Sequence, residues 1–139
     1  MENSRPKVAV NVFVIRGEKL LLGKRKGKSG DGDWGLPGGH LEFSEHLSDC
    51  AKRELAEETG LETSYLRFLQ LINDPTREDN THYLHINFVT ENIFGEPQLM
   101  EPDKCYEWKW FDFTDLPKNI FLGHRASIST FFKKISFVS

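Results

Sequence analysis

Residues 53–60 of this chain read R-E-L-A-E-E-T-G, and this short segment constrains the fold and the chemistry more than any other. An α-helix advances about 100° per residue, so Glu57 and Glu58 each lie within about 60° of Glu54 on one helix face. Carboxylates this close repel one another and destabilise an isolated helix. A hard divalent cation would neutralise them, and Mg²⁺ takes oxygen ligands that it shares with substrate phosphates. The spacing therefore predicts a helix that carries a metal site, with a solvated, charge-rich surface as the alternative.

The remaining pattern predicts strands before and after this helix. Alternating and β-branched residues predict strands at 7–16, 20–24, 66–73, 82–91 and 106–113, the first two joined as a hairpin by a turn at 17–19. Residues 27–39 hold six glycines and one proline, which is typical of a loop that wraps a ligand. Ser44 is the predicted N-cap of the acidic helix, Gly60 its C-terminal stop, and 124–137 a second helix. This order predicts an α/β (α+β) fold with a mixed β-sheet between helices.

Composition narrows the class of protein. The 139 residues suit one domain, 1–139, and 38% hydrophobic content suits a globular core. A net charge of −3 does not favour a nucleic-acid partner, and no apolar run is long enough to span a membrane. The N-terminus lacks the apolar segment of a signal peptide. Two cysteines make no disulfide framework, and Cys50 lies on the apolar helix face, so we expect a buried free thiol and a cytoplasmic protein.

The acidic segment belongs to a longer pattern, G-x5-E-x7-R-E-U-x-E-E-x-G-U, in which U is aliphatic. Every fixed position is filled, by Gly39, Glu45, Arg53, Glu54, Leu55, Glu57, Glu58, Gly60 and Leu61. The pattern resembles the Nudix box, the signature of the Nudix hydrolases. The segments LLGKRK, LPGGHLEFSE, HYLHI and MEPDKCYEWKWFDFTDLP are similar to MutT-type nucleoside triphosphate pyrophosphatases, including enzymes that act on oxidised or modified purine nucleotides. One departure is Ser44, where that subgroup usually has glycine.

The resemblance implies the Nudix fold and a Mg²⁺-dependent enzyme, with Mn²⁺ as a substitute, that cleaves a nucleoside triphosphate to a monophosphate and pyrophosphate. The partner would be a small-molecule nucleotide, and a homodimer is compatible with the resemblance. Two alternatives stay open. One is hydrolysis of another diphosphate, such as a nucleotide sugar, a dinucleotide or a prenyl diphosphate. The other is a non-catalytic nucleotide-binding module, which an intact box disfavours.

The resemblance also implies roles for single residues. Glu54 and Glu58 are the expected direct metal ligands, with Glu57 close behind, and the Gly39 carbonyl completes the site. Arg53 pairs with Glu45, orients the site and holds Glu54, against the alternative of an ordinary surface ion pair. The carboxylate that activates water is either a box glutamate or an acid from a distant loop, for which Glu101 is favoured over Asp103. The predicted catalytic residues are Arg53, Glu54 and Glu57, and the predicted metal set is Gly39, Glu54, Glu57, Glu58 and Glu101.

Four further residues are predicted to bind substrate. Gly38 lets the backbone approach a phosphate, and His40 contacts a phosphate unless it is a structural loop histidine. Arg25 clamps a phosphate through two hydrogen bonds, with a solvated basic patch as the alternative. Phe121 stacks on a base or, alternatively, packs in the core. Tyr83 and His85 share one face of a strand, and the sequence leaves open whether that face lines the pocket.

Overall fold

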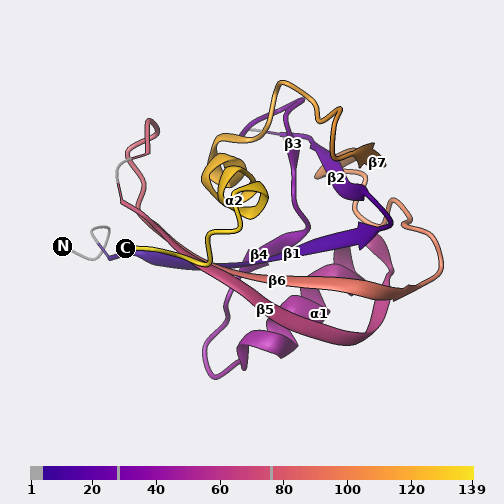
Figure 1. The fold of residues 1–139 in the computed structure, drawn as a ribbon, viewed down its shortest axis with the longest axis horizontal. Coiled ribbons are helices and arrows are strands. Elements are labelled where there is room, and N and C mark those ends of the chain that lie inside the picture. Colours follow the sequence, from indigo (N-terminus) through magenta and orange to yellow (C-terminus); the bar gives the residue numbers. More distant parts are fainter. Residues whose placement is uncertain (1–4, 28, 76) are drawn as a thin grey trace.

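The computed structural model describes residues 5–27, 29–75 and 77–139, which form one mixed sheet with a helix on each face (Figure 1). The strands are β1 (Lys7–Arg16), β2 (Lys19–Arg25), β3 (Trp34–Gly35), β4 (Gly38–His40), β5 (Glu62–Asp74), β6 (Tyr83–Phe94), β7 (Cys105–Asp112) and β8 (Phe137–Val138). The helices are α1 (Leu47–Thr59) and α2 (Leu122–Phe132). The predicted mixed sheet between two helices is confirmed. No helix in the described part of the chain is long and apolar enough to cross a membrane.

Strand β1 organises the sheet, because it pairs with three neighbours. The sheet order is β3-β2-β1-β6-β5-β8, with β4 added to β1 and β7 added to β2. The β1–β2 hairpin is antiparallel, with Ile15 opposite Leu20, as predicted. Strand β6 runs parallel to β1 with Ala9 opposite His85, and β4 runs antiparallel to it with Asn11 opposite Gly38. Strand β4 pairs with residues 9–11 of β1 and β6 pairs with residues 7–14, so the glycine-rich segment lies across β1 from the start of β6.

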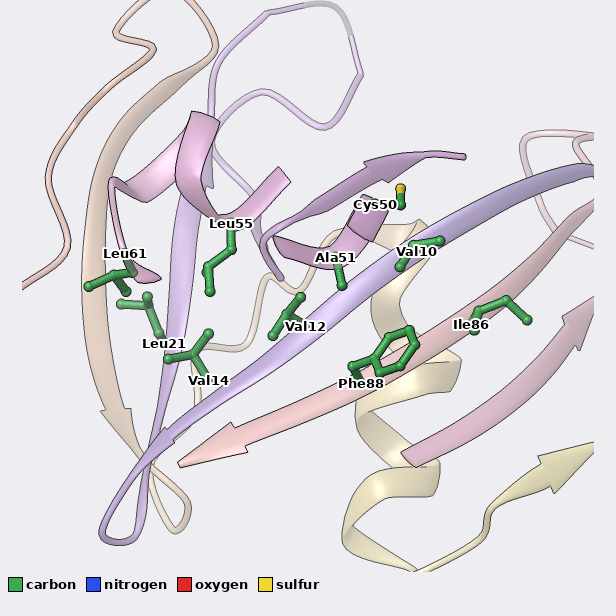
Figure 2. Close-up of a cluster of buried hydrophobic side chains, with 10 residues drawn as sticks. All are labelled: Val10, Val12, Val14, Leu21, Cys50, Ala51, Leu55, Leu61, Ile86 and Phe88. Atoms are coloured by element: carbon green, nitrogen blue, oxygen red, sulfur yellow. The ribbon is translucent and has the colours of Figure 1, made fainter. Parts of the chain in front are cut away.

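Alternation along β1 builds two cores. Val10, Val12 and Val14 point to the side of the sheet that α1 covers. They form one buried cluster with Leu55 of α1 and the other side chains labelled in Figure 2. Phe13 belongs to the core on the α2 side and stacks on Phe131, with ring centroids 4.6 Å apart. The strand is therefore buried on both faces and fixes the position of both helices.

The predicted start of the acidic helix is wrong. Helix α1 begins at Leu47 after His46, which makes no side-chain cap, and Ser44 has a φ of 64°, in the left-handed region. The Glu45 carboxylate accepts a hydrogen bond from the Glu42 backbone N–H and two from Arg53, which holds residues 42–45 in a turn. The predicted end is right, because Gly60 caps the helix with a φ of 71°.

Two other predicted boundaries differ from the structure. The last helix spans 122–132 instead of 124–137, because Lys134 adopts a φ of 58° and the chain then pairs with β5 as β8. The predicted loop at 27–39 contains β3 and the start of β4. Both short strands pair with long ones over only two or three residues, so they leave little periodicity to detect.

Candidate active site

A cleft of about 570 Å³ opens where α1, β4, β6 and the start of α2 meet. One wall is acidic and is formed by Glu54, Glu57, Glu58 and Glu101. The other lining residues from the predicted set are Arg25, Gly38, Gly39, His40 and Phe121. The fold therefore brings together every predicted site residue except Arg53, which lies behind the acidic wall and binds Glu54.

The two glycines of β4 let the backbone approach the acidic wall closely. A Cβ atom at Gly39 would lie 2.5 Å from the carboxylate carbon of Glu54. The Gly38 backbone N–H donates a 2.8 Å hydrogen bond to Glu58 Oε1. A side chain at position 39 would displace Glu54, so glycine is required there for the observed geometry.

Arg53 connects three carboxylates from behind this wall. Its Nε and Nη2 donate to the two oxygens of Glu45 at 2.7 and 3.0 Å. Its Nη1 donates to Glu54 Oε1 at 2.8 Å and lies 3.4 Å from Glu57. The hydrogen bonds from Arg53 to Glu45 hold the pKa of Glu45 at about 2, well below its ordinary value. The guanidinium therefore grips Glu45 as a fork and uses its remaining nitrogen to hold Glu54, which is more specific than a single surface ion pair.

The acidic wall is short of positive charge. Burial raises the pKa of Glu58 to about 8, against the lowering effect of the Gly38 N–H. Burial also raises the pKa of Glu54, although the hydrogen bond from Arg53 opposes this. Repulsion between these carboxylates and Glu101 adds to both shifts. Carboxylates with raised pKa values that line a cleft are typical of a functional site.

The donor chemistry of this wall suits a hard cation, since carboxylate and backbone oxygens are the ligands that Mg²⁺ prefers. In the described ranges, however, no three His, Cys, Asp or Glu side chains are arranged so that they could hold one ion together. Arg53 draws Glu54 and Glu57 to one side, while the Gly38 N–H holds Glu58. The residues thus fit a divalent metal by type and place, and rotation of the carboxylates would be needed to bind it.

Glu101 comes to this wall from the segment between β6 and β7, which is distant in sequence. Its carboxylate is 28% exposed and lies 3.7 Å from Lys104 Nζ. Asp103, the other acid considered from the sequence, is exposed and does not line the cleft. Of the two outside candidates, only Glu101 is positioned to meet a ligand in the cleft.

Arg25 and Phe121 form a stacked pair in the cleft wall. The Arg25 guanidinium lies 3.7 Å from the centre of the Phe121 ring, and its Nε donates to the Ser29 carbonyl. Burial lowers the pKa of Arg25, and no carboxylate in the described part of the chain lies within 4.0 Å of it. The charges of Glu58 and Asp33 raise the pKa of Arg25 and partly offset the effect of burial. Arg25 is therefore a partly desolvated cation that forms no direct ion pair with the described residues, which suits an anionic ligand. Phe121 is also packed against Gly30, Gly123 and His124, so its ring is held within the cleft wall as well as lining the cleft.

The lining also contains residues that sequence reasoning missed or left open. His40 shares a 2.9 Å hydrogen bond with the hydroxyl of Tyr83, whose ring also stacks near His85. Tyr83 and His85 both line the cleft, which answers the question of their face. Asn11 was missed, although it is the one polar residue in the apolar run 8–15 and this signal was available. Arg77 was missed because its segment has no periodic pattern.

Comparison of this chain with known proteins agrees with its resemblance to the Nudix box. The NUDIX domain model matches residues 5–131. An ADP-ribose pyrophosphatase from Methanocaldococcus jannaschii is 36% identical over 116 residues, which cover 84% of this chain and 68% of that protein. An isopentenyl-diphosphate Delta-isomerase from Cereibacter sphaeroides is 30% identical, covering 81% of this chain and 67% of the relative. An oxidized purine nucleoside triphosphate hydrolase from Mus musculus is 31% identical, covering 76% of this chain and 66% of the relative.

The fold has a similar counterpart among solved structures. A MutT NUDIX hydrolase from Burkholderia pseudomallei superimposes with a TM-score of 0.83 and 28% sequence identity, covering 91% of this chain and 98% of that one. The family match spans both helices up to residue 131, and the structural match spans most of the sheet as well. This chain therefore belongs to the Nudix hydrolase family.

Proposed function

We propose that this protein is a divalent-metal-dependent pyrophosphohydrolase that cleaves a purine nucleoside triphosphate, including oxidised or modified ones, to the monophosphate and pyrophosphate. The observation that carries the proposal is the acidic wall, whose four glutamates line one cleft together with Arg25. Buried, mutually repelling carboxylates need cations, and a polyphosphate brings its own metal ion with it.

Glu54, Glu57, Glu58 and the Gly39 carbonyl are the residues that would hold Mg²⁺, or Mn²⁺ in its place. When bound, the ion would neutralise negative charge on phosphate oxygens as the P–O bond breaks. Arg53 keeps Glu54 in place through its 2.8 Å hydrogen bond. Glu101, or a box glutamate, takes the proton of the attacking water. Arg25 donates to phosphate oxygens, and His40 lies at the rim of the same cleft.

The polar lining supports a nucleoside rather than a prenyl group. The cleft is lined mostly by charged and polar side chains, including those of Asn11 and Tyr83. An apolar chain placed against such a lining would displace its water without supplying hydrogen-bond partners, which is costly. The 31% identity to an oxidized purine nucleoside triphosphate hydrolase supports a purine nucleoside triphosphate as the substrate.

A second candidate is the hydrolysis of ADP-ribose. The specific observation in its favour is the 36% identity to an ADP-ribose pyrophosphatase over 84% of this chain. ADP-ribose carries a diphosphate that the same acidic wall would bind. The two candidates differ in their products: pyrophosphate is released only from the triphosphate.

The test is a product-resolved assay with Mg²⁺ on common and oxidised nucleoside triphosphates, ADP-ribose, a nucleotide sugar and geranyl diphosphate. We expect a monophosphate and pyrophosphate from a purine triphosphate, loss of turnover in excess EDTA, and recovery with Mg²⁺. Glu54→Gln is expected to abolish turnover, whereas Asp49→Asn, on the exposed side of the same helix, is not. Cleavage of ADP-ribose alone would favour the second candidate, and full activity in EDTA would contradict the metal-dependent mechanism.

A further inference from the structure

His124, in the first turn of α2, is a buried titratable residue of the cleft wall that the proposed mechanism does not use. It lines the cleft, yet it is only 7% exposed. Its ring fits there because position 35 is glycine. A Cβ atom at Gly35 would lie 2.8 Å from His124 Nδ1 and 3.2 Å from its Cε1. The Nδ1–Cε1 edge of the imidazole ring therefore packs against β3.

A hydrogen bond at this edge selects the tautomer of the ring. The Leu36 backbone N–H donates to His124 Nδ1 at 2.9 Å. A backbone nitrogen has only a proton to offer, so Nδ1 accepts and carries no proton of its own. Burial lowers the pKa of His124 well below its ordinary value, and the nearby Arg25 charge adds to this, so the ring is neutral at pH 7. A neutral imidazole with an accepting Nδ1 carries its proton on Nε2.

The Nε2–H of His124 is a donor that opens into the cleft. Among the described residues, the side-chain nitrogens that are both buried and without a partner are Arg77 Nε and His85 Nε2. His124 Nε2 is not one of them, and its ring makes its hydrogen bond through Nδ1, so Nε2 meets the open space that His124 lines. The Phe121 ring stands edge-to-face with His124 at 5.0 Å between centroids, and the His85 ring lies 6.4 Å away. These two rings limit the directions from which an acceptor reaches the donor.

The place of His124 in the fold indicates which part of a ligand meets this donor. The acidic wall comes mainly from α1 on one face of the sheet, whereas His124 comes from α2 on the other (Figure 1). A nucleotide whose phosphates and metal ion lie at the acidic wall therefore extends towards α2 with its nucleoside. A few fixed polar groups in a cleft orient a ligand, and a neutral N–H suits the uncharged acceptor atoms of a base or a sugar.

We propose that His124 is a substrate-binding residue whose Nε2–H donates to an acceptor atom of the base or sugar of the bound nucleotide. The inference rests on the proposed function and adds to it a contact that positions the nucleoside. The Leu36 N–H holds the ring in place before the ligand arrives, so little freedom is lost on binding. Such a contact acts equally in the ground state and the transition state, and its loss raises KM without lowering kcat.

The first experiment observes the ring in the wild-type protein without metal or turnover. In ¹⁵N-labelled protein the ring nitrogens of His124 report the tautomer directly, and we expect the proton on Nε2. We expect GMP to shift the Nε2–H signal and pyrophosphate to leave it in place. Ribose 5-phosphate is the third ligand: a shift with it assigns the acceptor to the sugar, and a shift with GMP alone assigns it to the base. A proton on Nδ1, a shift with pyrophosphate, or no shift with any ligand would overturn the inference.

The second experiment separates binding from chemistry. His124→Leu removes the donor, and we expect KM for a purine nucleoside triphosphate to rise about fivefold while kcat stays within about twofold of wild type. His124→Gln offers an acceptor to the Leu36 N–H and a donor to the ligand, so it should recover part of this loss. His46→Leu, at the exposed residue before α1, should keep the wild-type constants. An unchanged KM in His124→Leu, or a loss in kcat alone, would contradict the inference. If His124→Leu fails to fold, the spectrum of the wild-type protein still decides.

The outcomes separate this inference from the proposed function. Cleavage of a nucleoside triphosphate with an unchanged His124 signal would leave the hydrolase proposal standing and remove the contact. A shift with GMP, without cleavage of any triphosphate, would support the contact and contradict the proposed reaction.

Discussion

Gly39 is the residue at which the backbone and the acidic wall come closest. A Cβ atom there would lie 2.5 Å from the Glu54 carboxylate, so Gly39→Ala must move that carboxylate. We expect kcat/KM to fall at least about 100-fold, since each tenfold loss corresponds to only about 1.4 kcal/mol of transition-state stabilisation. The free energy of unfolding in urea should change much less than activity does.

Gly95→Ala is the matched control for this substitution. No atom lies within 4 Å of a Cβ at position 95, but the φ of 87° strains any other residue. It should lower stability by about 1 kcal/mol and leave turnover unchanged. An active Gly39→Ala enzyme would mean that Glu54 does not need its observed position.

The Arg53–Glu45 fork predicts an acid-sensitive contribution to stability. The folded-state pKa of Glu45 is about 2, below the ordinary value of 4.5, so this contribution is present above about pH 4.5 and is lost as the pH falls towards 2. Glu45→Gln should flatten the dependence of the unfolding free energy on pH in that window. Glu18→Gln, at an exposed turn, should keep the wild-type slope. Identical slopes in all three proteins would contradict this role.

The acidic residues were predictable from the sequence because helix geometry alone places Glu54, Glu57 and Glu58 on one face. The opposite side of the cleft, with Arg77 and His85, was not predictable, for two physical reasons. Arg77 lies in a segment whose position depends on contacts with Tyr83 and Asp79 rather than on any periodicity. The place of His85 depends on the pairing of β6 with β1, whose residues are distant in sequence.

At the level of elements, the end of α1 follows from one residue. Gly60 adopts a φ of 71° and its N–H donates to the Ala56 carbonyl. Gly60→Ala should cost about 1 kcal/mol of unfolding free energy, and Gly60→Asn less, because asparagine tolerates this conformation better. Urea denaturation of the three proteins measures the order. Equal stabilities would show that the left-handed cap is not required.

The start of α1 illustrates why one boundary was predictable and the other was not. A C-terminal glycine is a local signal, whereas the turn at 42–45 depends on Arg53 reaching back to Glu45 from the second turn of the helix. Serine is a preferred N-cap residue, so the sequence predicts that the helix starts after Ser44. The contact between Arg53 and Glu45 instead keeps residues 42–45 in a turn, and the first helical residue is Leu47. The last helix is shortened in the same way, since β8 gains a pairing with β5 that no local pattern reveals.

Across the whole molecule, the cleft lies where the two faces of the sheet contribute different chemistry. Helix α1, which packs on Val10, Val12 and Val14, supplies the acidic wall. The other face of β1 supplies Asn11, next to His85 of β6 and close to the start of α2. The acidic side of the cleft and the opposite side, with Asn11 and His85, therefore both depend on the same buried strand.

This arrangement predicts that divalent metal and fold stability are coupled. Burial raises the pKa of Glu58 to about 8, so its contribution to stability is full below about pH 4.5 and is lost as the pH rises through 8. An ion that binds only the native carboxylates restores stability by mass action. Mg²⁺ should therefore raise the melting temperature more at about pH 8.5 than at about pH 5.

Glu58→Gln separates the metal from the charge. Without metal at about pH 8.5, this variant should melt at a higher temperature than wild type, because the amide keeps the hydrogen bond from Gly38 without a buried charge. It should also lose most of the Mg²⁺-dependent shift, while Asp49→Asn keeps it. A wild-type melting temperature that ignores Mg²⁺ at both pH values would place the ion elsewhere. In that case the raised pKa of Glu58 would reflect burial alone, with no metal to offset it.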